Sequence, residues 1–347
     1  MNKIQKIGLT ALAGSLVMVS ANAIEYTMSG GLLSTYSSSS QSDSGVVGGR
    51  GIGTATDLSF NASGELDNGF TVDYFMGIDT HKALSNTSSF MTVGMGSLGT
   101  IRINNDSGSQ ANSLDDVTPH AYNETWDGVT SVTNPSFFGN ATTEGSVDYR
   151  IAPQEYQGMT VNASYTFDPD ANVAAPAKAG VTDPVSNGGS GQAVTLQLAH
   201  ESGLSVGGGY EELASNAGSV HSEESRVTGF VKYAMGGLTV AYQEAYQNTF
   251  NEATTAGAAG EGADKEAVFM GVAYTMGDMT VSYATSEYDV KAVSTTAALI
   301  TEEMSSIQVA YTMGAMTVSA AMSETDNVAG ITAIDYEENT LAVSFAF

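Results

Sequence analysis

Carboxylates dominate the side chains of this sequence that are able to do chemistry. There are 38 Asp and Glu against 11 Lys and Arg, a formal net charge of −27. The four histidines are scattered without metal-binding spacing. We therefore predict no enzyme activity. We also expect no cofactor and assign no metal-binding residues, with Ca²⁺ or Mg²⁺ at the acidic loops as the one candidate.

The largest group of candidate functional carboxylates lies in a 40-residue segment, 106–145, that has no strand pattern. Connections of this length without secondary structure usually have a function or are disordered. The segment also contains Trp126 and the pair Phe137-Phe138. The carboxylates selected as candidates are Asp106, Asp115, Asp116, Glu124 and Asp127.

Three near-copies in the last third of the chain indicate the elements that must position this segment. Residues 231–242, 272–283 and 309–320 each contain an alternating apolar run, a Met-Gly turn and a second alternating run. Alternation with a period of two is typical of strands with one apolar face, and glycine supplies the positive φ of a tight turn. Each copy therefore predicts a β-hairpin.

The same alternation, followed along the chain, predicts an all-β protein of about sixteen antiparallel strands. Short turns alternate with longer loops, as in transmembrane barrels of bacterial outer membranes. Such a barrel pairs every backbone N–H and C=O in hydrocarbon and needs no disulfide, which suits a chain with no Cys. The expected strands are 25–35, 56–64, 70–78, 88–95, 99–105, 146–152, 158–167, 191–200, 204–213, 225–235, 238–247, 266–276, 279–288, 304–313, 316–324 and 337–347.

The two ends of the chain carry sorting signals. Residues 1–23 contain Lys3 and Lys6, an apolar run and the small-X-small sequence Ala21-Asn22-Ala23, which predicts a secretory signal peptide. The last seven residues alternate apolar and small side chains and end at Phe347. With its signal peptide, amphipathic hairpins and terminal Phe, the chain resembles the general diffusion porins of Gram-negative outer membranes. The resemblance covers the whole mature chain, 24–347, as one transmembrane barrel domain.

The resemblance implies a role for the acidic segment and for the last residue. In that family the third external loop, at the same place in the strand order, folds into the barrel and narrows the pore. Residues 106–145 are then the constriction loop, with Arg50, Arg102 and Arg150 as candidates for the facing wall. Phe347 is expected to be recognised by the barrel-assembly machinery, and the barrel is expected to form a homotrimer in the outer membrane, in contact with lipid and lipopolysaccharide.

The register predicts which side chains face lipid. Val309, Tyr311 and their equivalents in the other hairpins form the apolar face, whereas Lys232 and Gln308 belong to the polar face that must line the lumen. Three tyrosines stand just before the Met-Gly turns, a place suited to an interfacial aromatic girdle. These are Tyr233, Tyr274 and Tyr311.

The predicted function is passive diffusion of ions and small hydrophilic solutes through a water-filled channel. Without Lys3 and Lys6, 9 basic residues remain against 38 acidic ones, which gives the mature chain a formal net charge of −29. This charge favours cations and argues against nucleic acid as a partner. Three alternatives stay open: a substrate-selective channel, a barrel enzyme, and a structural or adhesive surface protein.

Overall fold

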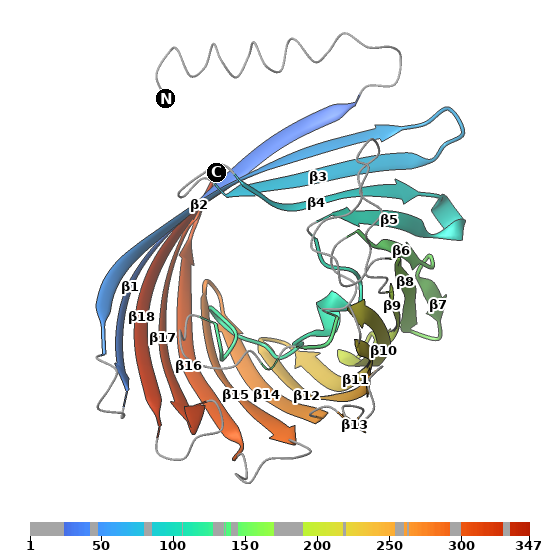
Figure 1. The fold of residues 1–347 in the computed structure, drawn as a ribbon. Helices are drawn as coiled ribbons and strands as arrows, with labels where there is room; N and C mark the ends of the chain where they lie inside the picture. The colour runs from blue at the N-terminus through green and yellow to red at the C-terminus, as the bar shows by residue number, and fades with distance from the viewer. Residues whose placement is uncertain are drawn as a thin grey trace.

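Eighteen β-strands in one sheet make up nearly all of the described part of the computed structural model (Figure 1). The structure describes residues 24–41, 48–79, 85–105, 107–127, 135, 137–139, 145–169, 190–217, 220–253, 260–261, 264–291, 300–328 and 334–347. The expected signal peptide lies outside these residues. The two helical elements described are single 3₁₀ turns, η1 (Gly96–Leu98) and η2 (Asn112–Leu114). Within the described ranges no helix has the length and apolar character needed to cross a membrane.

The strands follow the predicted order, and most are longer than predicted. Their bounds are β1 Glu25–Gln41, β2 Arg50–Glu65, β3 Thr71–Asp79, β4 Ser85–Gly94, β5 Thr100–Asn105, β6 Val147–Arg150, β7 Gln154–Tyr156, β8 Met159–Asp168, β9 Ser190–His200, β10 Leu204–Ala217, β11 Val220–Met235, β12 Leu238–Ala253, β13 Gly260–Glu261, β14 Asp264–Met276, β15 Met279–Lys291, β16 Glu302–Met313, β17 Met316–Asp326 and β18 Tyr336–Ala346.

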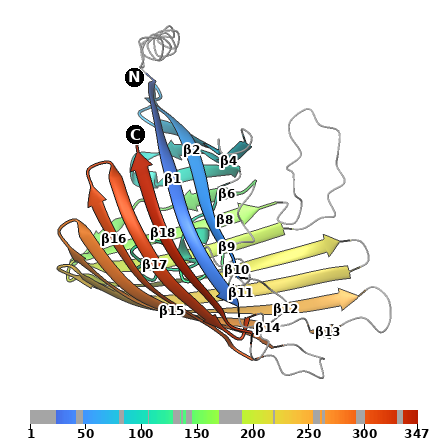
Figure 2. The same cartoon turned by 90° about the vertical axis from the view of Figure 1, so that its left-hand side faces the viewer.

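These elements form a closed barrel of sixteen crossings, as predicted. The short β6 and β7 both pair with β8 and belong to one crossing, while β13 is a two-residue extension paired with the end of β12. Each remaining strand pairs with its neighbours in chain order, and β1 pairs with both β2 and β18. Figure 2 shows β1 and β18 side by side where the ring closes. No strand of the ring is therefore left with an unpaired edge.

The last residue completes this closure. The N–H of Gly30 donates to the carbonyl of Phe347 at 2.7 Å, and the N–H of Phe347 donates to the carbonyl of Gly30 at 2.9 Å. A Cβ on Gly30 would lie 2.7 Å from the Phe347 ring, so the close approach requires glycine there. The terminal strand is therefore fixed to the first strand up to its final residue.

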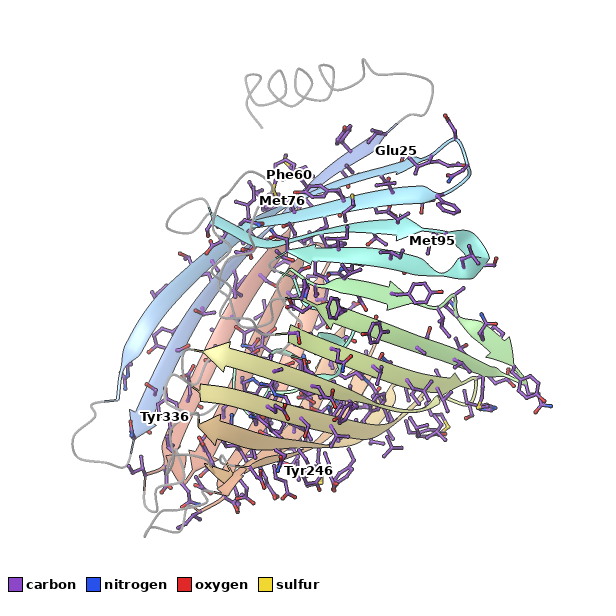
Figure 3. All side chains as sticks on the ribbon, turned by 45° about the vertical axis from the view of Figure 1, so that its right-hand side comes forward. Glu25, Phe60, Met76, Met95, Tyr246 and Tyr336 are labelled. Carbon is purple, nitrogen blue, oxygen red and sulfur yellow. The ribbon has the colours of Figure 1, made fainter. Side chains whose placement is uncertain are left out.

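Side chains alternate between the two faces of the barrel wall as the register predicted. On β16, Ile307 and Tyr311 are 56% and 45% exposed on the outer face, whereas Gln308 is 2% exposed on the inner face. Figure 3 shows the side chain of Tyr246 on the outside of β12. Tyr274 and Tyr311 are also exposed on the outer face, beside the short turns. Their role as a membrane-interface girdle stays a prediction.

Candidate pore constriction

The connection between β5 and β6, here called L3, lies inside the ring of strands (Figure 1). Its described residues are 107–127, 135, 137–139 and 145–146. Backbone N–H groups of L3 donate to polar side chains on the inner wall. Val117 donates to Oε1 of Gln243 on β12, and Ala121 donates to Oγ of Ser282 on β15, both at 2.8 Å. The predicted inward fold of this loop is confirmed.

Two apolar clusters also hold L3 against the wall. The first joins Trp126 and Phe137 of L3 to wall side chains of β12, β14, β15 and β16, and the rings of Trp126 and Phe269 lie 5.5 Å apart between centroids. The second joins Leu114 and Phe138 of L3 to Ala193 on β9. Full burial of a large apolar side chain contributes roughly 1.5–3 kcal/mol, so these clusters fix L3 more firmly than its hydrogen bonds alone.

Two wall glycines provide the space in which L3 packs. A Cβ added to Gly271 on β14 would lie 2.9 Å from the side chain of Thr118 and 3.0 Å from that of Pro119. A Cβ added to Gly209 on β10 would lie 2.5 Å from the ring of Phe138. Real Cβ atoms do not approach other atoms so closely, so any larger residue at either position would push L3 toward the lumen.

Arg226 on β11 anchors the second half of L3, although the sequence analysis did not select it. Its Nη1 donates to the carbonyl of Phe137 at 2.8 Å, and its Nη2 pairs with Glu224 at 2.7 Å. Glu211 is fully buried, lies 3.6 Å from the guanidinium and accepts from the N–H of Gly139 at 2.9 Å. The signal that would have found this anchor is the hairpin register, which places Glu211 directly opposite Arg226.

The predicted carboxylates of L3 that the structure describes lie close enough together for the charge of one to change the pKa of another. Burial, and after it the negative charges of Asp115, Asp127 and Asp116, raise the pKa of Glu124 to about 8. Burial also raises the pKa of Asp116, partly offset by hydrogen bonds from Thr118, and that of the more exposed Asp127. Asp106, the fifth predicted carboxylate, lies outside the described residues.

Two of the three predicted wall arginines lie on the inner face. Nη2 of Arg150 on β6 pairs with Asp148 at 2.6 Å. Arg102 on β5 lies over the ring of Phe90, with Cζ 3.6 Å from its centroid, and Nη2 donates to Ser107 of L3 at 3.2 Å. Arg50 lies on the other face. It is the first residue of β2 and is in register with Ser38 on β1. Two residues further along, the pair Ile52 and Tyr36 is exposed on the outer face, and residues two apart in a strand share a face. Arg50 therefore does not line the lumen.

A polar cavity of about 260 Å³ remains between L3 and the wall formed by β1, β16, β17 and β18. Tyr122 and Asp127 line it from L3, and Ser37, Glu338 and Thr340 line it from the wall. Glu338 accepts hydrogen bonds from Tyr336 at 2.9 Å and from Thr340 at 3.0 Å. In the described part of the chain, no group of three or more His, Asp or Glu is placed to hold a metal ion.

The closed sixteen-strand barrel with an inward-folded third loop defines a channel protein of the outer-membrane β-barrel class. Residues 8–301 match the family described as Gram-negative porin, and the chain belongs to this family. It is a porin of the outer membrane and crosses that membrane many times as a β-barrel.

Solved structures of other porins have the same fold. An anion-selective porin from Comamonas acidovorans superposes with a TM-score of 0.67 at 12% identity, over 94% of this chain and 100% of that one. The trimer form of OmpT, an outer membrane protein of Vibrio cholerae, gives 0.61 at 11% identity over 94% and 100%. OmpF of Salmonella typhi, in complex with daunomycin, gives 0.60 at 13% over 93% and 97%. At these identities the likeness concerns the fold alone. A comparison with curated proteins found no match.

Proposed function

We propose that this porin forms a water-filled channel that prefers cations and passes small hydrophilic solutes passively, without catalysing a reaction. The observation that carries the proposal is the contrast between acids and bases around L3. The acidic side chains of Asp115, Asp116 and Asp127, joined by Glu124 once the pH exceeds its pKa of about 8, occupy the loop that folds into the barrel. The basic side chains near the loop interact with carboxylates, with a backbone carbonyl or with an aromatic ring.

Four basic side chains of the inner wall lie near L3, and each has an interaction partner in the structure. Arg150 is paired with Asp148, and Arg226 with Glu224. Nζ of Lys232 donates to the carbonyl of Val117 at 3.1 Å. The guanidinium of Arg102 lies over the Phe90 ring. Two of these four positive charges are compensated by carboxylates, and the other two are engaged by L3 and the Phe90 ring. The field that a permeating ion experiences is therefore dominated by carboxylates, which raise the local concentration of cations.

The anion selectivity stated for the Comamonas acidovorans porin does not argue against this proposal. That protein is 12% identical to this chain and shares its fold. Selectivity depends on which charged side chains line the lumen, and these side chains vary on a common barrel. The sign of the preference must therefore come from the charges of this chain.

The experiment is the zero-current potential of single pores in a planar bilayer under a KCl gradient. The double variant Asp115→Asn/Asp116→Asn removes two L3 carboxylates and should lower the K⁺ over Cl⁻ preference. The matched control is Glu303→Gln/Glu324→Gln, which removes two carboxylates from the register positions of the outer face. Equal potentials for the two double variants would place the selective carboxylates outside L3.

We also propose that the barrel is a homotrimer. The similarity to OmpT of Vibrio cholerae, solved in a trimer form, supports this proposal. Analytical ultracentrifugation of the detergent-solubilised protein should give three times the mass of one chain plus bound detergent. A single-chain mass in several mild detergents would contradict it.

Phe347 is proposed to be a signal for the barrel-assembly machinery in addition to its pairing with Gly30. The two roles separate in the variants, because Phe347→Ala keeps the backbone pairing while deletion removes it. If the ring is recognised, Phe347→Ala lowers the yield of folded barrel in the outer membrane and Phe347→Tyr restores most of it. A normal yield of folded barrel for Phe347→Ala would mean that the ring is not recognised and that Phe347 acts only through its backbone pairing with Gly30.

We also propose that the signal peptide, residues 1–23, is removed during export. Cleavage after Ala23 would make Ile24 the first residue of the mature protein, and N-terminal sequencing of the outer-membrane form tests this.

The exposed apolar side chains of the outer face, such as Val309 and Leu341, are expected to contact membrane lipid. Carboxylates at the ends of the strands, including Glu303 and Glu324, suit contact with lipopolysaccharide through divalent cations.

A further inference from the structure

A pair of phenylalanine rings faces the lumen from the wall formed by β3 and β4. Phe75 and Phe90 are directly opposite in the register, with ring centroids 5.1 Å apart and planes inclined by 18°. Their neighbours across the sheet on the same face are polar, Asn61 on β2 and Asn104 on β5. Apolar rings on the lumen-facing side of a porin wall are exposed to water instead of lipid, which is unfavourable. Their position on this face therefore suggests a function.

The inward direction of these rings follows from their neighbours. Asn104 is in register with Phe90, and its Oδ1 accepts from Oγ of Ser107 in L3 at 3.3 Å. The residues next to them in sequence, Tyr74 before Phe75 and Met91 after Phe90, are exposed on the outer face. Phe75 and Phe90 themselves are partly exposed, so part of the ring surface is open to the channel.

The guanidinium of Arg102 shows which kind of group these rings accept. Its Cζ lies 3.6 Å from the centroid of the Phe90 ring, a cation–π contact of a flat, delocalised cation with an aromatic face. Phe75 stacks beside Phe90 and contributes a second ring to the same wall. A solute with a similar flat positive group therefore meets a surface of the chemistry that already holds Arg102.

Carboxylates adjoin the rings on the same face of the wall. Asp73 precedes Phe75 by two residues on β3 and so shares its face, and it lies opposite Thr92 of β4. Asp57 and Asp79 are opposite one another across β2 and β3, again on this face. A cation that stacks on Phe75 is thus close to negative charge, whereas an anion would meet three carboxylates along the same two strands.

We propose that the wall around Phe75, Phe90 and Asp73 is a transit site for organic cations that carry an aromatic or guanidinium group. The flat group stacks on Phe75 and the positive charge is directed toward Asp73. This inference rests on the proposed cation-preferring channel and names the class of solute that the channel binds best. The site retains a solute only weakly, as passage requires, because exposed cation–π contacts are individually small.

The test is the block of K⁺ current through single wild-type pores in a planar bilayer by benzyltrimethylammonium. Cyclohexylmethyl-trimethylammonium has the same charge and a similar size without an aromatic ring. Block by the aromatic cation should occur at about two- to fivefold lower concentration than block by its saturated analogue. Phe75→Leu should remove this difference, because it keeps an apolar side chain and deletes the ring. Tyr74→Leu, on the outer face of the same strand, should keep it.

The remaining outcomes decide between this proposal and others. Asp73→Asn should weaken block by both cations, since it removes the charge that both use. Equal block by the two cations in the wild-type pore, or an unchanged difference in Phe75→Leu, would overturn the proposal. Stronger block by benzoate than by the aromatic cation, lost in Arg102→Gln, would also overturn it and assign the wall to aromatic anions. The KCl zero-current potential of the same pores tests the general cation preference separately, so a failure of either claim is recognised independently.

Discussion

The side-chain amide of Gln308 on β16 is joined to the backbone of Asn123 in L3 by two hydrogen bonds. Nε2 donates to the Asn123 carbonyl at 2.5 Å, and Oε1 accepts from the Asn123 N–H at 3.2 Å. The same Oε1 accepts from the N–H of Tyr122 at 2.8 Å. Gln308 faces inward, as the alternation predicted, yet it lies under L3 instead of facing the water of the channel. It is a fastening point for the constriction.

Replacing Gln308 by Met keeps the length of the side chain and removes these hydrogen bonds. Leaving buried polar groups without a partner costs about 1–3 kcal/mol each, so the central part of L3 should move away from the wall more often. Single-channel recordings should show greater current noise and more frequent changes of conductance than in the wild type. Thr312→Val, on the same strand and face but next to the short turn, is the control. Identical noise in Gln308→Met and the wild type would count against this fastening role.

A second prediction uses the space that Gly271 leaves for L3. Gly271→Val would bring a side chain against Thr118 and Pro119, so the loop must shift toward the lumen. The pore should become narrower, and the single-channel conductance should fall measurably. Gly229→Val is a suitable control, because the atom nearest to a Cβ at that position is 4.0 Å away. An unchanged conductance in Gly271→Val would mean that L3 does not limit the current.

The raised pKa of Glu124 predicts that selectivity depends on pH. With a pKa of about 8 instead of 4.5, Glu124 is mostly protonated and neutral at pH 7 and becomes negative as the pH rises to 9. The preference for K⁺ should therefore increase between pH 7 and pH 9. Zero-current potentials across this range should lose most of the increase in Glu124→Gln and retain it in Glu303→Gln. A flat wild-type profile would contradict a titration of Glu124 in this range that affects the passing ions.

The register gives a prediction about stability. Val309 is exposed on the outer face, and an arginine in the lipid-facing band costs up to roughly 2–4 kcal/mol, most at its middle and less toward the interface that Tyr311 is expected to mark. Val309→Arg should therefore lower the free energy of unfolding, measured in urea with refolded protein in lipid vesicles. Thr312→Arg should have a much smaller effect, because Thr312 lies on the inner face. Similar losses for the two variants would be inconsistent with the assigned faces.

The barrel was predictable from the sequence because its information is local and repeated. Alternating residues and Met-Gly turns specify each hairpin, and chain order then specifies the neighbours, so the strand count and the faces of Val309 and Gln308 followed from the pattern. The prediction missed the full length of strands such as β11 and β12, since polar residues follow one another near their ends, as at His221 to Glu224 and at Gln247 to Thr249, and the alternation is lost there.

The contacts of L3 were much less predictable. The segment has no periodicity, and its place inside the barrel depends on partners up to 186 residues away, such as Gln308 for Tyr122. The role of Arg226 depends on a carboxylate, Glu211, on the neighbouring strand. Arg50 illustrates the opposite error. It was selected for its charge alone, whereas the pairing of β1 with β2 places it on the outer face.

The most direct test of the account is the zero-current potential of the wild-type pore in a tenfold KCl gradient, measured once near 0.01 M and once near 1 M. The Debye length is about 30 Å at the lower concentration and 3 Å at the higher, so the carboxylates of L3 act across the lumen only in the first case. The account predicts a potential of the sign that reports K⁺ over Cl⁻ at low salt, with a clear decrease at high salt. A potential of the opposite sign, reporting Cl⁻ over K⁺, would contradict it.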